Sequence, residues 1–168
     1  MFNWKLKGGE MRKLIYLCIA VALSVPLIAI AASSDLAVVV NKTNATSNLT
    51  KSELRKLVLG EQESWPGGMK VTVTLRAQGN PERVAVLKVV CRMSEDEYIQ
   101  HSMHSDFVGT AMNAPRIVNS AAAMRQLVSS IPGAIGFLPL SEVNDTVKVV
   151  SVEGVSAGEP DYKIKVGQ

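Results

Sequence analysis

A predicted strand, a glycine turn and a predicted helix follow one another in Val71–Val90, VTVTLRAQGNPERVAVLKVV. Apolar residues alternate with threonine over residues 71–75, and this period of two predicts a half-buried strand that ends at Arg76. Asn80 and Pro81 are preferred residues for the N-cap and the first position of a helix. The stretch therefore predicts a strand–turn–helix unit. The connection from the strand to the helix, Arg76–Arg83, is called the joint, and it decides how the chain can bind a ligand.

This joint has two interpretations, an anion cradle or a well-capped helix. In the first, backbone N–H groups near Gly79 face an anion at the positive end of the helix dipole. Arg76 then adds a bidentate contact to an oxyanion, and Gln78 and Asn80 add neutral hydrogen bonds. In the second, Asn80 only caps the helix and no ligand is held. The residues alone leave both interpretations open.

Two residues of the first helical turn favour the capped helix. Pro81 has no N–H group to offer an anion. Glu82 puts a negative charge beside the proposed cradle, and an acidic residue is also what the first turn of an ordinary helix prefers. Further along, the helix is expected to bury an apolar stripe at three-to-four spacing, made by Val84, Leu87, Val90 and Cys91.

The rest of the chain predicts an α/β domain. Thr50 and Ser94 are each followed three residues later by glutamate, the pattern of a capping box at a helix start. Another helix is expected to open at Asn119 or Ser120. Strands are predicted at residues 35–41, 71–76, 134–139 and 146–152, the first of them buried on both faces. We expect a small mixed β-sheet flanked by helices on both sides.

Residues 1–32 have the order of a secretory signal peptide. A basic start at Arg12 and Lys13 precedes an apolar core over residues 14–30, and cleavage is expected after Ala31 or nearby. Met11 is a candidate for the true start. The alternative is an uncleaved membrane anchor, because the apolar run approaches the roughly 18 residues that a span needs. Both predict a periplasmic or extracytoplasmic domain over residues 33–168.

The charge of this domain gives no electrostatic basis for binding nucleic acid. The whole chain has 18 Lys and Arg residues against 15 Asp and Glu residues, a formal charge of +3. Four of the basic residues and one of the acidic residues lie in residues 1–32, so 14 of each remain and the domain is formally neutral. We therefore expect no nucleic-acid partner.

The sequence predicts no enzyme, metal site or cofactor. His101 and His104 share one face of a predicted helix, but a metal site needs three or four convergent ligands and no compelling third is present. No glycine-flanked nucleophile or similar catalytic signature occurs. Cys91 is expected to be a small buried hydrophobic residue, and Trp65 a packing residue that covers the sheet edge.

Three segments together resemble a known family: VVVNKTNATSNLTKSELRKLVLGEQESWPGG (38–68), VTVTLRAQGN (71–80) and SSIPGAIGFLP (129–139). They are similar to the phosphate-binding-protein-like branch of the type II periplasmic binding proteins, the extracytoplasmic receptors of phosphate ABC importers. The resemblance covers residues 36 to about 162. It implies the fold of one lobe, in a chain about half as long as the two-lobed receptors.

The resemblance also implies a changed ligand site. In the family, this joint carries Arg followed by Asp, Gly, Ser, Gly and Thr, which grip the phosphate oxygens. Arg76 and Gly79 match that pattern. The other four positions differ: Gln78 stands for Asp, Asn80 for Ser, Pro81 for Gly and Glu82 for Thr. These changes remove a proton acceptor and a donor N–H and add a carboxylate that repels a dianion, so tight phosphate binding is not expected.

Two hypotheses follow from these observations. The first is an exported solute-binding-type domain that binds a small, phosphate-like oxyanion weakly or with altered specificity. Its site would comprise Arg76, Gln78, Gly79, Asn80 and, as a second charge, Arg83. The second is an envelope protein-interaction or sensing module that has lost ligand binding. It would contact another protein, or a second copy, through the face that a second lobe would otherwise cover.

Overall fold

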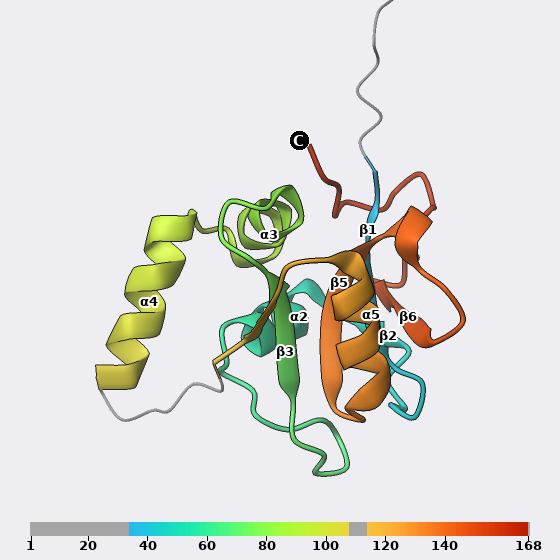
Figure 1. Ribbon diagram of the computed structural model, residues 1–168, viewed down its shortest axis with the longest axis horizontal. Helices are drawn as coiled ribbons and strands as arrows, with labels where there is room; N and C mark the ends of the chain where they lie inside the picture. The colour runs from blue at the N-terminus through green and yellow to red at the C-terminus, as the bar shows by residue number, and fades with distance from the viewer. Residues whose placement is uncertain (1–33, 108–113, 168) are drawn as a thin grey trace, which may run out of the picture. The chain divides into compact units, whose positions relative to one another are not determined.

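The computed structural model describes residues 34–107 and 114–167, without the side chains of residues 105–107, and the whole predicted leader lies outside them. The strands of the described residues form one six-stranded sheet in the order β2-β6-β1-β5-β3-β4 (Figure 1). Parallel and antiparallel neighbours both occur, so the predicted mixed sheet is confirmed.

The first strand, β1 (Leu36–Asn41), is buried over its full length. It pairs antiparallel with β5 (Ala134–Pro139) on one edge and with β6 (Val147–Val152) on the other. At the far side of β6, the two-residue strand β2 (Asn48–Leu49) pairs parallel. A continuous apolar run is the composition of a strand with both faces covered, so the prediction for residues 35–41 is confirmed.

The strand that leads to the joint, β3 (Thr72–Arg76), lies between β5 and β4 (Arg116–Val118) and is parallel to both. The predicted half-buried pattern is wrong at Thr74, whose side chain is 0% exposed. Because helices cover both sheet faces here, the alternation of valine and threonine does not mark a face open to solvent. The three-residue strand β4 was not predicted, since so short a segment shows no hydrophobic period.

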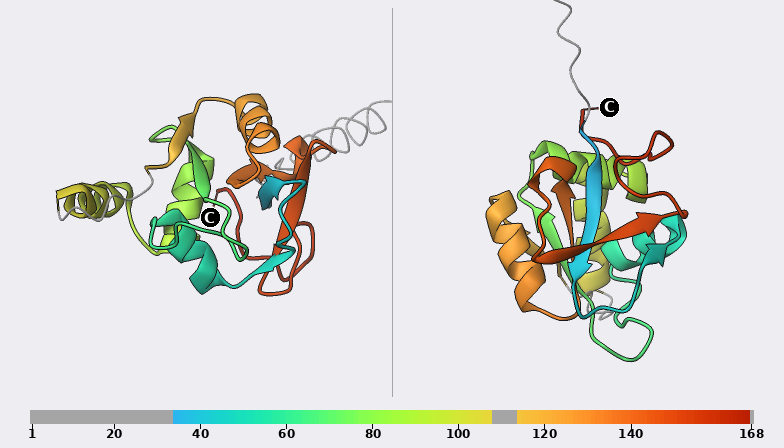
Figure 2. Two further views of the ribbon diagram at one scale, coloured as in Figure 1. Left: turned by 90° about the horizontal axis from the view of Figure 1, so that it is seen from below. Right: turned by 90° about the vertical axis from the view of Figure 1, so that its right-hand side faces the viewer.

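Helices cover both faces of the sheet (Figures 1 and 2). On one face, α5 (Ala121–Ser130) buries Met124 and Val128 against alternate residues of β1 and β5. On the other face, α2 (Lys51–Val58) and α3 (Pro81–Val86) pack on the remaining apolar residues of these strands. Two apolar layers, one on each side of the sheet, therefore make the core.

Two predicted capping boxes are present. The Thr50 hydroxyl accepts from the Glu53 N–H at 3.2 Å, and the Glu53 carboxylate accepts from the Thr50 N–H at 2.8 Å. The Glu53 carboxylate accepts from the Thr50 N–H and also from the Thr50 hydroxyl, and these two hydrogen bonds hold the pKa of Glu53 below its usual value. Ser94 and Glu97 make the same reciprocal pair at the start of α4 (Glu95–Phe107). Both helix starts are thus determined by local side-chain chemistry.

The helix after the joint changes its winding partway. After α3, the chain continues as the π-helix η1 (Leu87–Cys91), which ends at Arg92 in the left-handed conformation, with φ 55°. The predicted apolar stripe is correct for the three residues in η1 but wrong for Val84, which is 47% exposed. The wider π turn rotates the residues that follow relative to α3, so one α-helical stripe does not describe both segments.

The side chain of Asn41 joins the end of β1 to the end of α5. Its amide nitrogen donates to the carbonyl oxygens of Val128 at 2.9 Å and Ser129 at 2.8 Å. Its amide oxygen accepts from the N–H of Thr43 at 3.0 Å and from the Thr43 hydroxyl at 2.8 Å. Asn41 is 5% exposed, and its amide satisfies carbonyl groups that the helix end leaves free.

Asn41→Ala should lower the free energy of unfolding by about 2 kcal/mol, because two helix carbonyls lose a buried donor. Asn41→Asp should lower the free energy of unfolding further at neutral pH, since a carboxylate would face those carbonyls. Part of this loss should be recovered at acid pH, where the protonated carboxyl group can donate. Urea unfolding at several pH values measures both. Asn144→Ala is the control, because Asn144 makes the same turn with Thr146 at an exposed position. An equal decrease in the free energy of unfolding for Asn41→Ala and Asn144→Ala would contradict the role of Asn41.

Candidate functional site: the joint between β3 and α3

The joint is a tight turn held between two sheet strands and a helix. The Ala77 N–H donates to the Val118 carbonyl at 3.2 Å, and the Asn80 N–H donates back to the Ala77 carbonyl at 3.2 Å. Gly79 has φ +78°, a left-handed conformation that favours glycine, although a Cβ there would meet nothing within 4 Å. The Asn80 side-chain oxygen accepts from the Glu82 N–H at 3.0 Å, which confirms the predicted N-cap.

Arg76 forms an ion pair within the joint. Its Nε donates to the Glu82 carboxylate at 2.6 Å, and the two side chains are only 12% and 15% exposed. Its Nη1 is buried and has no hydrogen-bond partner among the described residues. One edge of the guanidinium is therefore neutralised by a carboxylate from the same turn, while another donor is left without an acceptor.

The Arg83 side chain links α3 to β3 and to α4. Its Nε donates to both Glu95 oxygens, at 2.9 and 3.0 Å, and its Nη1 donates to the Arg76 carbonyl at 3.2 Å. The guanidinium carbon lies 5.3 Å from the centroid of the Tyr98 ring. Arg83 is 7% exposed, so this charge holds α4 to the body of the domain rather than facing solvent.

The two arginines are balanced by two carboxylates, so the joint has no net charge from these four side chains. Gln78 and Gly79 are exposed beside them, and Asn80 is partly buried with its side-chain oxygen used by the cap. The structure thus brings the predicted residues into one turn. It places Arg76 at the turn itself, and directs Arg83 inward to Glu95.

Thr74 is a polar residue at this site that the sequence interpretation missed. It lies two residues before Arg76, on the same face of β3, because side chains in a strand alternate. Its hydroxyl is buried and, like the Arg76 Nη1, has no hydrogen-bond partner among the described residues. A signal was present in the run of Val and Thr, but it was interpreted as a solvent-facing pattern.

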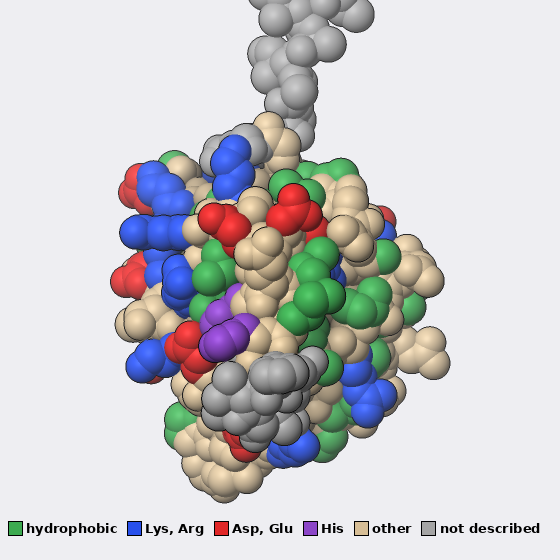
Figure 3. Space-filling model, turned by 90° about the vertical axis from the view of Figure 1, so that its left-hand side faces the viewer, with side chains coloured by type: hydrophobic (Ala, Val, Ile, Leu, Met, Phe, Trp, Pro, Cys, Tyr) green, Lys and Arg blue, Asp and Glu red, His purple; other side chains and the backbone are tan. Residues whose placement is uncertain are grey.

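The histidine pair of the sequence analysis, His101 and His104, lies on α4. Both imidazoles lie near each other at the surface in Figure 3. Within residues 34–104 and 114–167, where side chains are described, no three His, Cys, Asp or Glu residues come together as metal ligands. Cys91 is fully buried, as predicted, and burial raises the pKa of its thiol to about 12.

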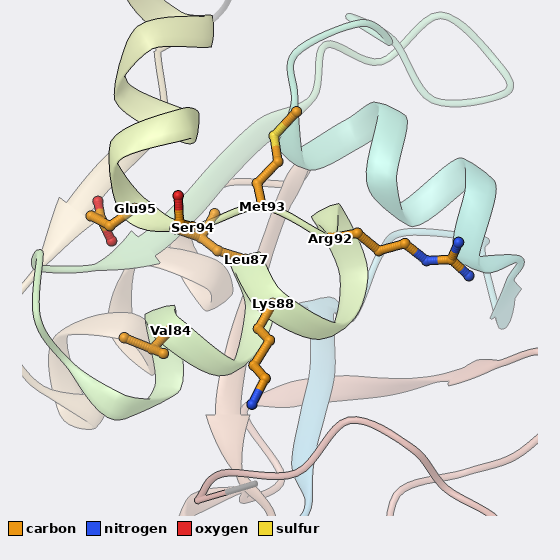
Figure 4. Close-up of a pocket in the computed structure, with 7 residues that line it drawn as sticks. All are labelled: Val84, Leu87, Lys88, Arg92, Met93, Ser94 and Glu95. Carbon is orange, nitrogen blue, oxygen red and sulfur yellow. The ribbon is translucent and has the colours of Figure 1, made fainter.

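A groove of about 550 Å³ lies between η1 and the start of α4. Figure 4 shows Val84, Leu87 and Met93 along it, with the charged ends of Lys88 and Arg92 directed outward and away from one another. Ligand pockets need polar groups that converge on the ligand. These charged ends do not converge, so the groove defines no ligand class.

In the part of the chain that the structure describes, no helix combines the length and apolar character required to cross a bilayer. The predicted leader lies outside this part, so its anchor and signal-peptide interpretations both remain predictions.

Solved structures of phosphate receptors have this fold. An ABC-type phosphate transport receptor from Vibrio cholerae is 23% identical, with a TM-score of 0.61 over 74% of this chain and 48% of the receptor. A phosphate ABC transporter substrate-binding protein with bound phosphate, from Clostridium perfringens, is 22% identical, with a TM-score of 0.65 over 79% and 53%. PstS from Borrelia burgdorferi is 17% identical, with a TM-score of 0.62 over 79% and 55%.

The chain spans about half the length of the solved structures that it matches. No protein-family model matches it. The class that the fold defines is therefore clear: the described residues have the fold of one lobe of a phosphate ABC transporter substrate-binding protein. This confirms the fold that the sequence resemblance implied.

Arg83→Lys should lower the free energy of unfolding by about 2 kcal/mol and speed amide exchange in α4, because lysine cannot reproduce the forked contact with Glu95. Urea unfolding and hydrogen exchange measure the two effects. Arg125→Lys is the matched control, since the pair of Arg125 with Glu142 is more exposed. This variant should lower the free energy of unfolding by less than about 1 kcal/mol. An unchanged exchange rate in α4 would contradict this role of Arg83.

Proposed function

We propose that this chain is a solute-binding-type domain that binds a small, phosphate-like oxyanion weakly at the joint between β3 and α3. Arg76 is the central contact, with Gln78, Gly79 and Asn80 beside it. Arg83 supports the site by donating to the Arg76 carbonyl, while its charge is paired with Glu95. The observation that carries the proposal is the buried Nη1 of Arg76, a cationic donor that has no acceptor among the described residues.

The unmatched groups at the site suit an oxygen-rich anion. A guanidinium nitrogen can only donate, and a threonine hydroxyl can donate as well as accept. Leaving such a group buried without a partner costs about 1–3 kcal/mol, which an anionic acceptor would recover. The matched receptor from Clostridium perfringens holds phosphate, so the fold is compatible with this ligand chemistry. No catalytic step is part of the proposal.

Weak binding is proposed because much of the donor capacity of the joint is already engaged. Glu82 pairs with Arg76, and Glu95 with Arg83. The Glu82 N–H donates to Asn80, and Pro81 has no N–H at all. Only one buried, unpaired donor of one arginine therefore remains for an anion, with a carboxylate nearby.

A second candidate is an envelope protein-interaction or sensing module without a ligand, including self-association. The exposed apolar residues favour it: Met103 is 66% exposed, Ile117 51% and Val84 47%. Exposed apolar side chains are used in contacts between proteins, but they also occur singly on ordinary surfaces. Oxyanion binding is preferred because two of the three unmatched buried polar atoms among the described residues, on Arg76 and Thr74, lie at the joint.

Isothermal titration of the full chain with phosphate should give a dissociation constant of roughly 1 mM, the strength of a few solvent-diluted contacts. Arg76→Ala should weaken binding at least about tenfold, because it removes the charged donor. Arg125→Ala is the control, since it removes an arginine from an exposed pair on α5. No heat at millimolar ligand in the wild type would reject this function, and concentration-dependent elution in size-exclusion chromatography would then identify the interaction module.

We further propose that residues 1–32 direct export and that the domain of residues 33–168 works in the periplasm or another extracytoplasmic space. The order of basic start, apolar core and small residues supports this. The exported protein should have an intact mass that corresponds to a start within a few residues of Ser33. Recovery of the uncleaved chain in the membrane fraction would instead support the anchor.

A further inference from the structure

The carboxylate of Glu82 is a negatively charged group within the joint itself. It lies in the first turn of α3, and its N–H is fixed by the Asn80 side-chain oxygen at 3.0 Å. The same residue presents its carboxylate to the Arg76 Nε at 2.6 Å. The cap therefore holds the backbone of Glu82 beside Arg76, and the ion pair leaves only the remaining guanidinium edge for a ligand.

The ion pair is shielded enough for its charge to influence a neighbouring ligand. Arg76 and Glu82 are 12% and 15% exposed, so solvent screens them less than a surface pair. Arg83 cannot supply a compensating charge, because three of its donor contacts go to Glu95 and one goes to the Arg76 carbonyl. A ligand on the Arg76 Nη1 thus approaches a cation and an anion at once.

We propose that Glu82 sets the charge specificity of this site, so that singly charged oxyanions are accepted and dianions are disfavoured. The ligand binds at the Nη1 edge of Arg76 while Glu82 stays on the Nε edge. This inference rests on the proposed oxyanion function and adds which anions the site takes. Glu82 acts here as a specificity-determining residue, and Arg76 makes the contact.

Coulomb's law gives the expected size of the preference. At an effective dielectric constant of about 20, two unit charges some 6 Å apart interact by an amount that corresponds to roughly a hundredfold in affinity, and screening reduces this to about tenfold. A dianion experiences about twice the repulsion of a monoanion. Removing the charge of Glu82 should therefore shift the ratio of dianion to monoanion affinity by about tenfold.

Glu82→Gln tests this, because glutamine keeps the length of the side chain and an oxygen that can accept from the Arg76 Nε. The full chain and the variant are titrated with nitrate, whose charge is fixed at one, and with sulfate, whose charge is fixed at two. The wild type should bind nitrate at least as well as sulfate. In the variant, affinity for sulfate should rise about tenfold more than affinity for nitrate.

Glu63→Gln is the matched control for net charge. Glu63 is exposed, and its carbonyl accepts from the Val71 N–H, which places it beside the start of β3, at the opposite end from Arg76. This variant should leave both affinities unchanged. Thermal unfolding of both variants shows whether they keep the fold.

The outcomes separate this inference from the proposed function. An unchanged sulfate-to-nitrate ratio, with binding retained, overturns the role of Glu82 and leaves the oxyanion function standing. Binding by Glu82→Gln alone would show that Glu82 blocks the site, and it rejects both oxyanion binding by the wild type and the proposed acceptance of singly charged anions. Binding by neither protein rejects both the oxyanion function and the role of Glu82.

A measurement on the wild type covers the case in which Glu82→Gln does not fold. The Arg76 Nε–H resonance of the ¹⁵N-labelled full chain is identified by its loss in Arg76→Lys. It should keep the downfield position of a hydrogen bond to a carboxylate when nitrate is added. A shift to the position of a solvated guanidinium would show that the ligand displaces Glu82, which overturns the proposal.

Discussion

A strand buried on both faces and paired on both edges constrains everything around it. β1 has no residue open to solvent, so a helix layer must cover each of its faces and a strand must lie along each edge. This requirement accounts for α5 on one side and for α2 and α3 on the other. β3 is separated from β1 by β5, and the joint begins at its last residue, Arg76.

The joint combines the backbone of a strand-to-helix connection with two internal ion pairs. The turn, the glycine and the capped helix are all present, so the local geometry is that of a strand-to-helix connection able to face an anion. Each arginine of the joint is held by a carboxylate from a neighbouring helix turn. Ligand preference in such a site depends on which donors remain free after the protein has satisfied its own side chains.

The elements that could be predicted are those whose signals are local. The buried strand at residues 35–41 and the capped helices after Thr50, Asn80 and Ser94 each depend on a few adjacent residues. The exposure of Val84 could not be predicted, because it depends on a π turn that begins after it.

Within the site, Arg76, Gly79 and the Asn80 cap were visible from residue type and spacing. The pairing of Arg83 with Glu95 was not, since it joins residues that come together only when α4 folds back on α3. Thr74 was misjudged for a similar reason: its burial depends on layers contributed by distant parts of the chain.

The buried thiol of Cys91 has a consequence for the lifetime of the protein. Cys91 is the last residue of η1 and belongs to the apolar core, and desolvation raises the pKa of its thiol to about 12, so the reactive thiolate is scarce at neutral pH. Oxidants and electrophiles act on thiolates that they can reach. In an oxidising compartment, Cys91 would therefore survive as long as this packing stays closed, and its modification would record each opening of the core.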